Sequence, residues 1–401
     1  MGRADGMCCV GCMKWLALVS LVFAPVASAQ ACPSRPAWPT QAWPLQLVDP
    51  VKKADAIAAL EAAVFTLEGK PEERKGFRTN ALVVVHQGAI VYEKYARGFD
   101  ETKRQLSWSV AKSYSSTLVG LAVHQGLLSP DASVCSVLTE YEGTPACDST
   151  IEHFLTFSSG LQWQEEYENR GYQISSVISM LYGVGRRDQV RHVLTHRRLY
   201  APGTQFNYST GDAHVVAAIA KRVLAAKHGN DAFWTQFFDV LGMSSAVLEE
   251  DVSGNPLGGS FVFATPRDSA KFGWFLLNDG CWAGTRLVPE GWVRKATTIS
   301  AAWKSNRGDC SGQTVGADAY QLPCRPIPNG RMFWLNQPPA DGEPAPWPSA
   351  PPDAYAAQGH WGQRIVVVPS RDLVIVRFGD DRQTAMSSDL LVKHVLPLLD
   401  P

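Results

Sequence analysis

The chain has 401 residues, of which 45% are hydrophobic and 19% are charged, and its formal net charge is −1 at pH 7. A chain of this length can bury a sizeable core in one large domain or in two closely joined domains. The near-zero net charge creates no overall field that attracts nucleic acid, so no nucleic-acid partner is expected. These properties are typical of a globular protein.

The N-terminus has the pattern of an export signal. Lys14 precedes the apolar run Trp15 to Val26, and Ala27-Ser28-Ala29 is a small-x-small cleavage site. We therefore predict a signal peptide over residues 1–29, cleavage after Ala29, and a periplasmic or secreted mature protein. The apolar run is too short to span a bilayer comfortably, so no stable membrane insertion is expected after cleavage. Lipid attachment at Cys32 is disfavoured, because Ala29 stands where a large apolar residue is expected.

Cysteine usage agrees with an oxidising compartment. The cysteines at positions 8, 9 and 12 leave with the leader, so their Cys-x-x-Cys spacing is not a metal site. The mature chain keeps an even number of cysteines: Cys32, Cys135, Cys147, Cys281, Cys310 and Cys324. An even count in an exported protein predicts three disulfides. Pairing of sequence neighbours would join Cys135 to Cys147 and Cys310 to Cys324, leaving Cys32 for Cys281, although the sequence alone does not fix the connectivity.

Several elements can be placed from residue patterns. An amphipathic helix is predicted over Ala54 to Leu67. The β-rich runs 81–85 and 89–92 are separated by His86-Gln87-Gly88, which predicts a hairpin. A second helix is predicted from Ser109 to Gln125, with Gly126 in the stop position.

Ser109 and Lys112 form the most informative motif. Residues three apart on a helix lie one turn apart on the same face, so an amine stands beside a hydroxyl. A desolvated lysine becomes neutral enough to help remove the serine proton. The serine also stands at a helix N-terminus, where free N–H groups favour a developing oxyanion. Ser107 and Ser113 have simpler interpretations, a helix cap and a surface hydroxyl.

A second candidate is Tyr208. It lies in the turn-rich stretch 202–210, which precedes a strongly periodic helix predicted over Asp212 to Lys227. A phenol held there beside an ammonium group can act as a general acid and base. The alternative is a buried tyrosine that bonds to backbone. Glu165 and Glu166 follow Trp163 in another loop, and a catalytic carboxylate there is the less favoured interpretation.

The third candidate is the segment Gly359-His360-Trp361-Gly362-Gln363, which opens the strand-like run Ile365 to Val368. Glycine allows a substrate to approach a strand closely, so the Gln363 N–H is a candidate second oxyanion donor beside the Ser109 N–H. The alternative is an edge strand kinked by glycine. We find no internal repeat, phosphate-binding glycine loop or metal-ligand spacing, so no cofactor or metal is expected.

Taken in order, these three motifs resemble the serine β-lactamase-like hydrolase family, which includes class C β-lactamases, D-amino-acid peptidases, family VIII esterases and 6-aminohexanoate-dimer hydrolases. Further stretches carry the same resemblance: 153–161, Leu241-Gly242-Met243, 258–260 and 265–268. Residues 180–183 followed by 208–212 are most similar to the 6-aminohexanoate-dimer hydrolase branch. The resemblance implies an acyl-enzyme on Ser109, with Tyr208 as proton shuttle and Lys112 as its electrostatic partner.

Two departures from the family pattern concern the substrate. Thr210 stands where β-lactamases usually carry the asparagine of Tyr-x-Asn, and His360-Trp361-Gly362 replaces Lys-Thr-Gly. These four positions are the expected substrate-binding residues. Loss of the amide-holding asparagine and of the carboxylate-attracting lysine favours a small ester or a short linear amide over a β-lactam.

Other functions remain open. A β-lactamase or D-amino-acid peptidase would use the same machinery. A non-catalytic binding or sensor module is disfavoured because a pure binder needs none of this chemistry. A Ser-His-Asp triad is disfavoured by the absence of a Gly-x-Ser-x-Gly elbow.

The resemblance implies an α+β fold of the β-lactamase/transpeptidase type, with an antiparallel sheet flanked by helices and an inserted, mostly helical domain. We expect the sheet domain over residues 30–126 and 279–401, the helical domain over 127–278, and the site in the cleft between them. Strands are expected over Gly359 to Phe378 and a final helix over Met386 to Leu399.

Two surface features complete the sequence interpretation. The proline-rich stretch 323–352 predicts a surface loop at the cleft, with Trp334 and Trp347 as apolar walls. A basic cluster spans 186–198. It is typical of a solvated helix face, and attraction of an anionic substrate group is the alternative.

Overall fold

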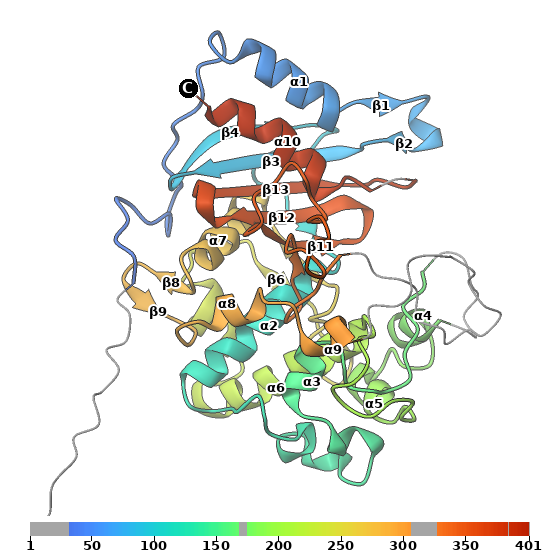
Figure 1. Ribbon diagram of the computed structural model, residues 1–401. Coiled ribbons are helices and arrows are strands. Elements are labelled where there is room, and N and C mark those ends of the chain that lie inside the picture. Colours follow the sequence, from blue (N-terminus) through green and yellow to red (C-terminus); the bar gives the residue numbers. More distant parts are fainter. Residues whose placement is uncertain (1–31, 168–174, 306–326, 384, 401) are drawn as a thin grey trace, which may run out of the picture. The chain divides into compact units, whose positions relative to one another are not determined.

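The computed structural model describes residues 32–167, 175–305, 327–383 and 385–400 (Figure 1). The predicted signal peptide and the predicted Cys310–Cys324 bridge lie outside the described residues. Residues 31–401 form one compact unit. The sheet-domain and helical-domain boundaries therefore stay a prediction.

A six-stranded antiparallel sheet, in the order β10-β11-β12-β13-β3-β4, is the main element of the fold. Its strands are β3 (Thr79–His86), β4 (Ala89–Tyr95), β10 (Trp334–Leu335), β11 (Tyr355–Gly359), β12 (Gln363–Val368) and β13 (Leu373–Gly379). The predicted hairpin is confirmed as β3 and β4, with positive φ at Gln87 and Gly88. The α+β architecture agrees with the predicted fold class.

Helices cover both faces of this sheet. Helices α1 (Ala54–Val64) and α10 (Ser388–Leu399) lie over one face, and α7 (Pro266–Leu277) packs on the other (Figure 1). Because side chains alternate along a strand, β3 serves two cores: Leu82 and Val84 face α1 and α10, whereas Val83 and Val85 join the larger core.

The larger core continues into the helical region. Here α2 (Val110–His124) packs against α6 (Thr210–His228), and α3 (Ile151–Leu155), α4 (Ser176–Leu181) and α5 (Gln189–Leu194) lie near α6. Nearly all of α2 is buried, including its polar residues. The free N–H groups in the N-terminal turn of such a buried helix make that turn a suitable place for a site.

The remaining elements are short. They are β1 (Leu67–Glu68), η1 (Pro71–Glu73), β2 (Lys75–Gly76), β5 (Gln105–Leu106), η2 (Val134–Ser136), η3 (Thr139–Tyr141), η4 (Pro145–Asp148), η5 (Trp234–Phe238), β6 (Val247–Leu248), β7 (Val262–Ala264), β8 (Cys281–Trp282), β9 (Thr285–Arg286), α8 (Trp292–Ala296), α9 (Ala301–Ser305), η6 (His360–Gly362) and η7 (Pro369–Arg371).

Some predicted boundaries were wrong by a few residues. The first helix ends at Val64 rather than Leu67, because Leu67 pairs with Gly76 in a small sheet. Helix α6 begins at Thr210 rather than Asp212, because the Ser209 side chain caps it by accepting from the Asp212 N–H. The last helix begins at Ser388 rather than Met386, again with a serine cap, Ser387.

The edge-strand interpretation of residues 359–363 was also wrong. β12 lies between β11 and β13, inside the sheet. The free edge belongs instead to the last residues of β11, because β10 pairs only with Tyr355 and Ala356. The short length of β10 leaves Gln358 and Gly359 without a strand partner on that side among the described residues.

Two predicted disulfides are confirmed. Cys32 bonds to Cys281 and Cys135 bonds to Cys147, with sulfur–sulfur distances of 2.07 and 2.04 Å. The first closes a loop of 249 residues, and a bridge over so long a loop restricts the unfolded chain strongly. In the part of the chain that the structure describes, no helix has the length and apolar character needed to cross a membrane.

Candidate active site

Ser109 stands at the turn between a strand and a helix. β5 pairs with β7, and the Ser107 N–H donates to Val262 O at 2.9 Å, which anchors the chain just before Ser109. Ser109 occupies the N-cap position of α2, and its side chain makes no capping hydrogen bond to the helix. Trp108 between them has a φ of +47°, a strained conformation for a bulky residue. This backbone bend presents the Ser109 side chain at the start of the helix.

Lys112 is buried beneath Ser109, with an exposed fraction of 1%. Its Nζ donates to Ser109 Oγ, Thr210 Oγ1 and Gly259 O, each at 2.8 Å. Burial lowers the pKa of Lys112 to about 8, and the nearby carboxylate of Glu165 acts in the opposite direction. A substantial neutral fraction near physiological pH follows, so this amine has the proton affinity that a base for Ser109 requires.

Tyr208 lies beside these groups and is half-buried. Lys112 Nζ is 4.8 Å from the centre of its ring, and the ring packs on Trp334 at 5.4 Å and on Phe157 at 4.9 Å. The loop before it is held by the Asn207 N–H, which donates to Phe157 O at 2.7 Å. The predicted trio of Ser109, Lys112 and Tyr208 is therefore brought together.

A cavity of about 230 Å³ opens at Ser109. The residues that line it are Ser109, Glu165, Tyr167, Tyr208, Trp334, Gln358, Gly359, His360 and Arg364. Three of the predicted site residues, Ser109, Tyr208 and His360, are among them. Lys112 and Thr210 lie behind the cavity wall and are almost fully buried.

Gln363 does not line the cavity. Its side chain donates to Gly379 O at 2.7 Å and to His360 O at 3.1 Å, and it accepts from the Gly379 N–H at 2.9 Å. These bonds tie the turn 360–362 to β13. Trp361 and Gly362 in that turn are likewise absent from the cavity wall. An oxyanion role for the Gln363 N–H stays a prediction.

The glycine that lets a strand come close to the nucleophile is Gly359. A Cβ atom at this position would lie 2.2 Å from Ser107 O and 3.2 Å from Ser109 N, so no other residue fits without movement. The end of β11 therefore runs directly beside the start of α2. The backbone of Gly359 consequently lies close to the backbone N–H of Ser109.

Thr210 and Glu165 form a polar cluster beside Lys112. Glu165 accepts from the Thr210 N–H at 2.8 Å and from Trp163 Nε1 at 2.6 Å, and the Thr210 hydroxyl donates to its other oxygen. Tyr167 OH also donates to Glu165, at 3.1 Å. The Thr210 hydroxyl is thus engaged by Lys112 and Glu165, which leaves it no free direction toward a substrate amide.

An aromatic wall surrounds the entrance. The Tyr167 ring stacks on His360 at 5.2 Å, and Trp108 meets Tyr167, His360 and Trp361 edge-on at 5.1 to 6.4 Å. Burial raises the pKa of Tyr167, so its hydroxyl stays protonated.

Trp334 joins the cavity wall as predicted, but Trp347 does not. It is buried in the core between the sheet and the α1–α10 layer. Asn336 causes this, because its side chain donates to Trp347 O and accepts from the Trp347 N–H, folding the loop inward.

Arg364 is a site residue that sequence reasoning missed. It lines the cavity although only 8% of it is exposed, and its Nη1 donates to Gln363 O at 2.8 Å and Gly359 O at 3.2 Å. No carboxylate among the described residues forms an ion pair with it, and its Nε has no hydrogen-bond partner there. Burial lowers its pKa to about 10, and neighbouring Arg377 adds to the shift. The sequence signal that could have revealed Arg364 is a single arginine next to the apolar run Ile365 to Val368.

No group of three or more histidine, cysteine, aspartate or glutamate side chains in the described ranges is arranged to hold a metal ion. The arrangement at Ser109 instead provides a nucleophile, a buried amine, a phenol and backbone N–H groups at a helix start. Such a set on an antiparallel sheet flanked by helices defines a serine hydrolase with the β-lactamase/transpeptidase-like fold.

Comparison with known proteins identifies the family. The Beta-lactamase family profile matches residues 57–392, so the chain belongs to the Beta-lactamase family, whose members are serine hydrolases. A 6-aminohexanoate-dimer hydrolase of Paenarthrobacter ureafaciens is 25% identical over 250 residues, which cover 61% of this chain and 64% of that protein. The match thus spans slightly less than two thirds of the relative.

Solved structures share the fold. A putative 6-aminohexanoate-dimer hydrolase from Bacillus anthracis has a TM-score of 0.65 at 19% identity, covering 90% of this chain and 87% of that one. A family VIII carboxylesterase has a TM-score of 0.57 at 16% identity, covering 88% and 98%. A class C β-lactamase has a TM-score of 0.57 at 16% identity, covering 87% and 96%.

Proposed function

We propose that this protein is an exported hydrolase that cleaves a small ester or a short linear amide through an acyl-enzyme on Ser109. The observation that carries the proposal is the 2.8 Å hydrogen bond between Lys112 Nζ and Ser109 Oγ, made by a buried amine at a cavity that Tyr208 also lines. The confirmed disulfides and the predicted signal peptide support export.

The proposed reaction begins as Ser109 passes its proton to Tyr208 while Tyr208 passes its own phenolic proton to the neutral amine of Lys112. Ser109 Oγ attacks the carbonyl carbon, and the oxyanion accepts from the Ser109 N–H and from a second N–H of residues 359–363. Tyr208 then protonates the leaving alcohol or amine as the carbonyl–heteroatom bond breaks, and Lys112 returns a proton to Tyr208. A water molecule hydrolyses the acyl-enzyme and regenerates Ser109.

The substrate that this cavity favours carries a carboxylate and an apolar chain. Arg364 provides a buried guanidinium without a carboxylate partner among the described residues, and an anion would compensate it. Trp334 and the aromatic wall suit an aliphatic chain. A linear aminohexanoate oligomer has both features, and the similarity to a 6-aminohexanoate-dimer hydrolase supports this class.

A β-lactam is the second candidate. The missing lysine of Lys-Thr-Gly argues against it, but Arg364 restores a cation inside the cavity. The charge of the cavity therefore does not distinguish a linear substrate from a β-lactam. The distinction requires a comparison of kcat/KM values for the two substrate classes.

The test is a comparison of kcat/KM for p-nitrophenyl butyrate, a linear aminohexanoate dimer and nitrocefin, with Ser109→Ala protein as the blank. We expect the first two to be cleaved more efficiently. Nitrocefin turnover far above both would establish a β-lactamase instead. No turnover of any ester, amide, D-alanyl peptide or cephalosporin would favour the binding-module alternative.

A further inference from the structure

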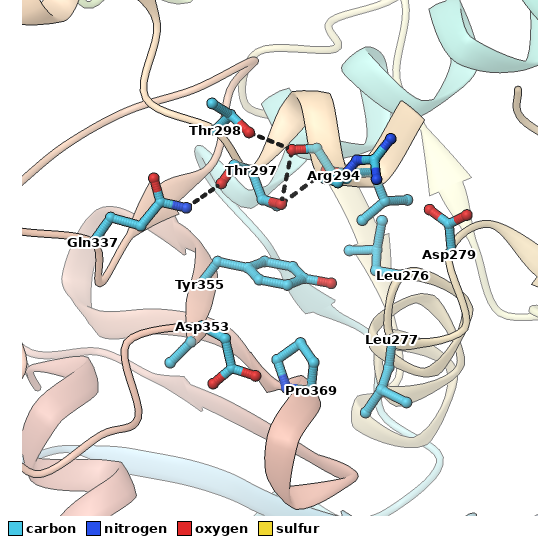
Figure 2. A pocket seen from close by; sticks show the side chains of 12 residues that line it. Leu276, Leu277, Asp279, Arg294, Thr297, Thr298, Gln337, Asp353, Tyr355 and Pro369 are labelled. Atoms are coloured by element: carbon cyan, nitrogen blue, oxygen red, sulfur yellow. Dashed lines mark hydrogen bonds between the residues drawn. The ribbon is translucent and has the colours of Figure 1, made fainter. Parts of the chain in front are cut away.

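A second cavity, of about 270 Å³, lies away from Ser109 (Figure 2). Its wall is formed by the end of α7, by α8 and by the first residues of β11, and it shares no lining residue with the cavity at Ser109. Tyr355 begins the strand whose other end, Gly359, reaches the nucleophile. Four residues of extended strand separate these positions by roughly 13 Å.

Tyr355 is the central residue of this second cavity. Its ring projects between α7 and the loop before β11, as Figure 2 shows, and it packs edge-on against Phe333 at 5.9 Å and 89°. Only 4% of Tyr355 is exposed, and its hydroxyl makes no hydrogen bond within the part of the chain that the structure describes. The oxygen is absent from the fully buried atoms without a partner and belongs to a residue of the cavity wall, so it is available to a ligand atom in the cavity.

Two carboxylates, Asp279 and Asp353, line the cavity together with the guanidinium of Arg294. Asp279 accepts from Arg286 Nη1 at 3.0 Å, and Asp353 accepts from the N–H and hydroxyl of Ser370 at 2.6 and 2.8 Å. Each carboxylate retains further acceptor positions. Burial and then the charges of Asp279 and Asp353 raise the pKa of Tyr355, so the hydroxyl is neutral and lies in the field of both acids.

The rest of the wall is apolar at one end and cationic at the rim. Leu276 and Leu277 of α7 face the Tyr355 ring in Figure 2, and Arg294 of α8 lies above them. The volume is slightly below the range of drug-sized pockets, which suits a small ligand. An aromatic face next to carboxylates is also a favourable place for a cation.

We propose that this cavity binds a small aliphatic ammonium ion. The ammonium group donates to Tyr355 Oη in the field of the Asp279 and Asp353 carboxylates, and the alkyl chain lies on Leu276 and Leu277. This site goes beyond the proposed hydrolase activity and does not depend on it.

The probe is hexylammonium chloride, titrated by calorimetry and by saturation-transfer NMR into full-length mature protein whose Ser109 has been blocked with a fluorophosphonate. If Ser109 proves unreactive, Ser109→Ala protein serves equally, so failure of the proposed function does not affect this test. We expect saturable binding at one site, and hexanoate, which has the same length and the opposite charge, should not compete.

Tyr355→Phe should weaken hexylammonium binding about tenfold, because one hydrogen bond to a charged group is lost while the ring is kept. Tyr182→Phe removes an exposed hydroxyl elsewhere and should have no effect. Asp353→Asn should weaken hexylammonium binding to a similar degree, because it removes the negative charge but keeps an acceptor for Ser370. The matched control is Asp341→Asn, which removes a charge from an exposed loop and should have no effect.

Thermal unfolding of Tyr355→Phe should be unchanged, since its hydroxyl has no partner to lose. Unchanged affinity in both Tyr355→Phe and Asp353→Asn, displacement by hexanoate, or no saturable binding at millimolar hexylammonium would each overturn the proposal.

Discussion

Lys112 Nζ lies 2.8 Å from Thr210 Oγ1, and the same threonine hydroxyl donates to the carboxylate of Glu165. A residue at the position where related β-lactamases usually carry asparagine therefore connects the buried lysine to a half-buried acid. This connection places a negative charge close enough to oppose the lowering of the Lys112 pKa by burial. We therefore expect Glu165 to influence the reaction through the pKa of Lys112.

The pH dependence of acylation follows from this arrangement. Lys112 has a pKa of about 8, below that of an exposed lysine, and only its neutral form accepts a proton. The rate should therefore rise as pH increases through about 8 and level off above it. Glu165→Gln removes the charge that raises the pKa of Lys112, so the rising limb should move to lower pH. A pH–rate profile of p-nitrophenyl ester hydrolysis measures this, and an unmoved limb in Glu165→Gln would exclude the coupling.

Ser109 should become covalently acylated. Intact-mass spectrometry after fluorophosphonate treatment should show one adduct, and Ser109→Ala should abolish it and lower kcat by orders of magnitude. Ser113→Ala is the matched control, since its hydroxyl donates to Met332 O at 2.7 Å and does not line the cavity. Labelling that persists in Ser109→Ala would remove the assignment.

Tyr208→Phe should slow acylation by roughly 10²- to 10⁴-fold, the usual contribution of a general acid–base group. The ring contacts with Trp334 and Phe157 are kept, so the melting temperature should change little. Stopped-flow measurement of the p-nitrophenol burst gives the acylation rate. Normal turnover by the phenylalanine variant would show that another group carries the proton.

Arg364→Gln should raise KM for a carboxylate-bearing substrate about ten- to a hundredfold, because a charge-assisted hydrogen bond is lost. Mono-p-nitrophenyl glutarate supplies the carboxylate, and p-nitrophenyl butyrate is the neutral comparison. The effect should be confined to the glutarate ester. Equal losses on both esters would indicate that Arg364 only supports the backbone of Gly359 and Gln363, to which it donates.

The mature protein should contain no free thiol. Two bridges join Cys32 to Cys281 and Cys135 to Cys147, and Cys310 and Cys324 are the remaining predicted pair. Ellman's reagent on denatured, unreduced periplasmic protein measures this. Two reactive thiols per chain would contradict the third bridge.

Local patterns in the sequence were sufficient to predict several elements of the fold and part of the candidate site. The spacing of Ser109 and Lys112 determines that both stand on one helical face, because helix geometry depends only on neighbouring residues. The turn at Gln87 and Gly88 determines the β3–β4 hairpin for the same reason. Tyr208 was also foreseeable, because the helix that follows fixes where its loop ends.

Only the tertiary structure decided which residues enclose the substrate cavity and which lie behind it. Gly359 lies beside the start of α2, at the end of β11, where the shorter strand β10 no longer pairs with it. Trp347 turns inward because the Asn336 side chain bonds to its backbone. Glu165 and Arg364 acquire their roles from burial beside groups far away in the chain. The energy of a buried charge is set by its surroundings in space, which sequence spacing does not encode.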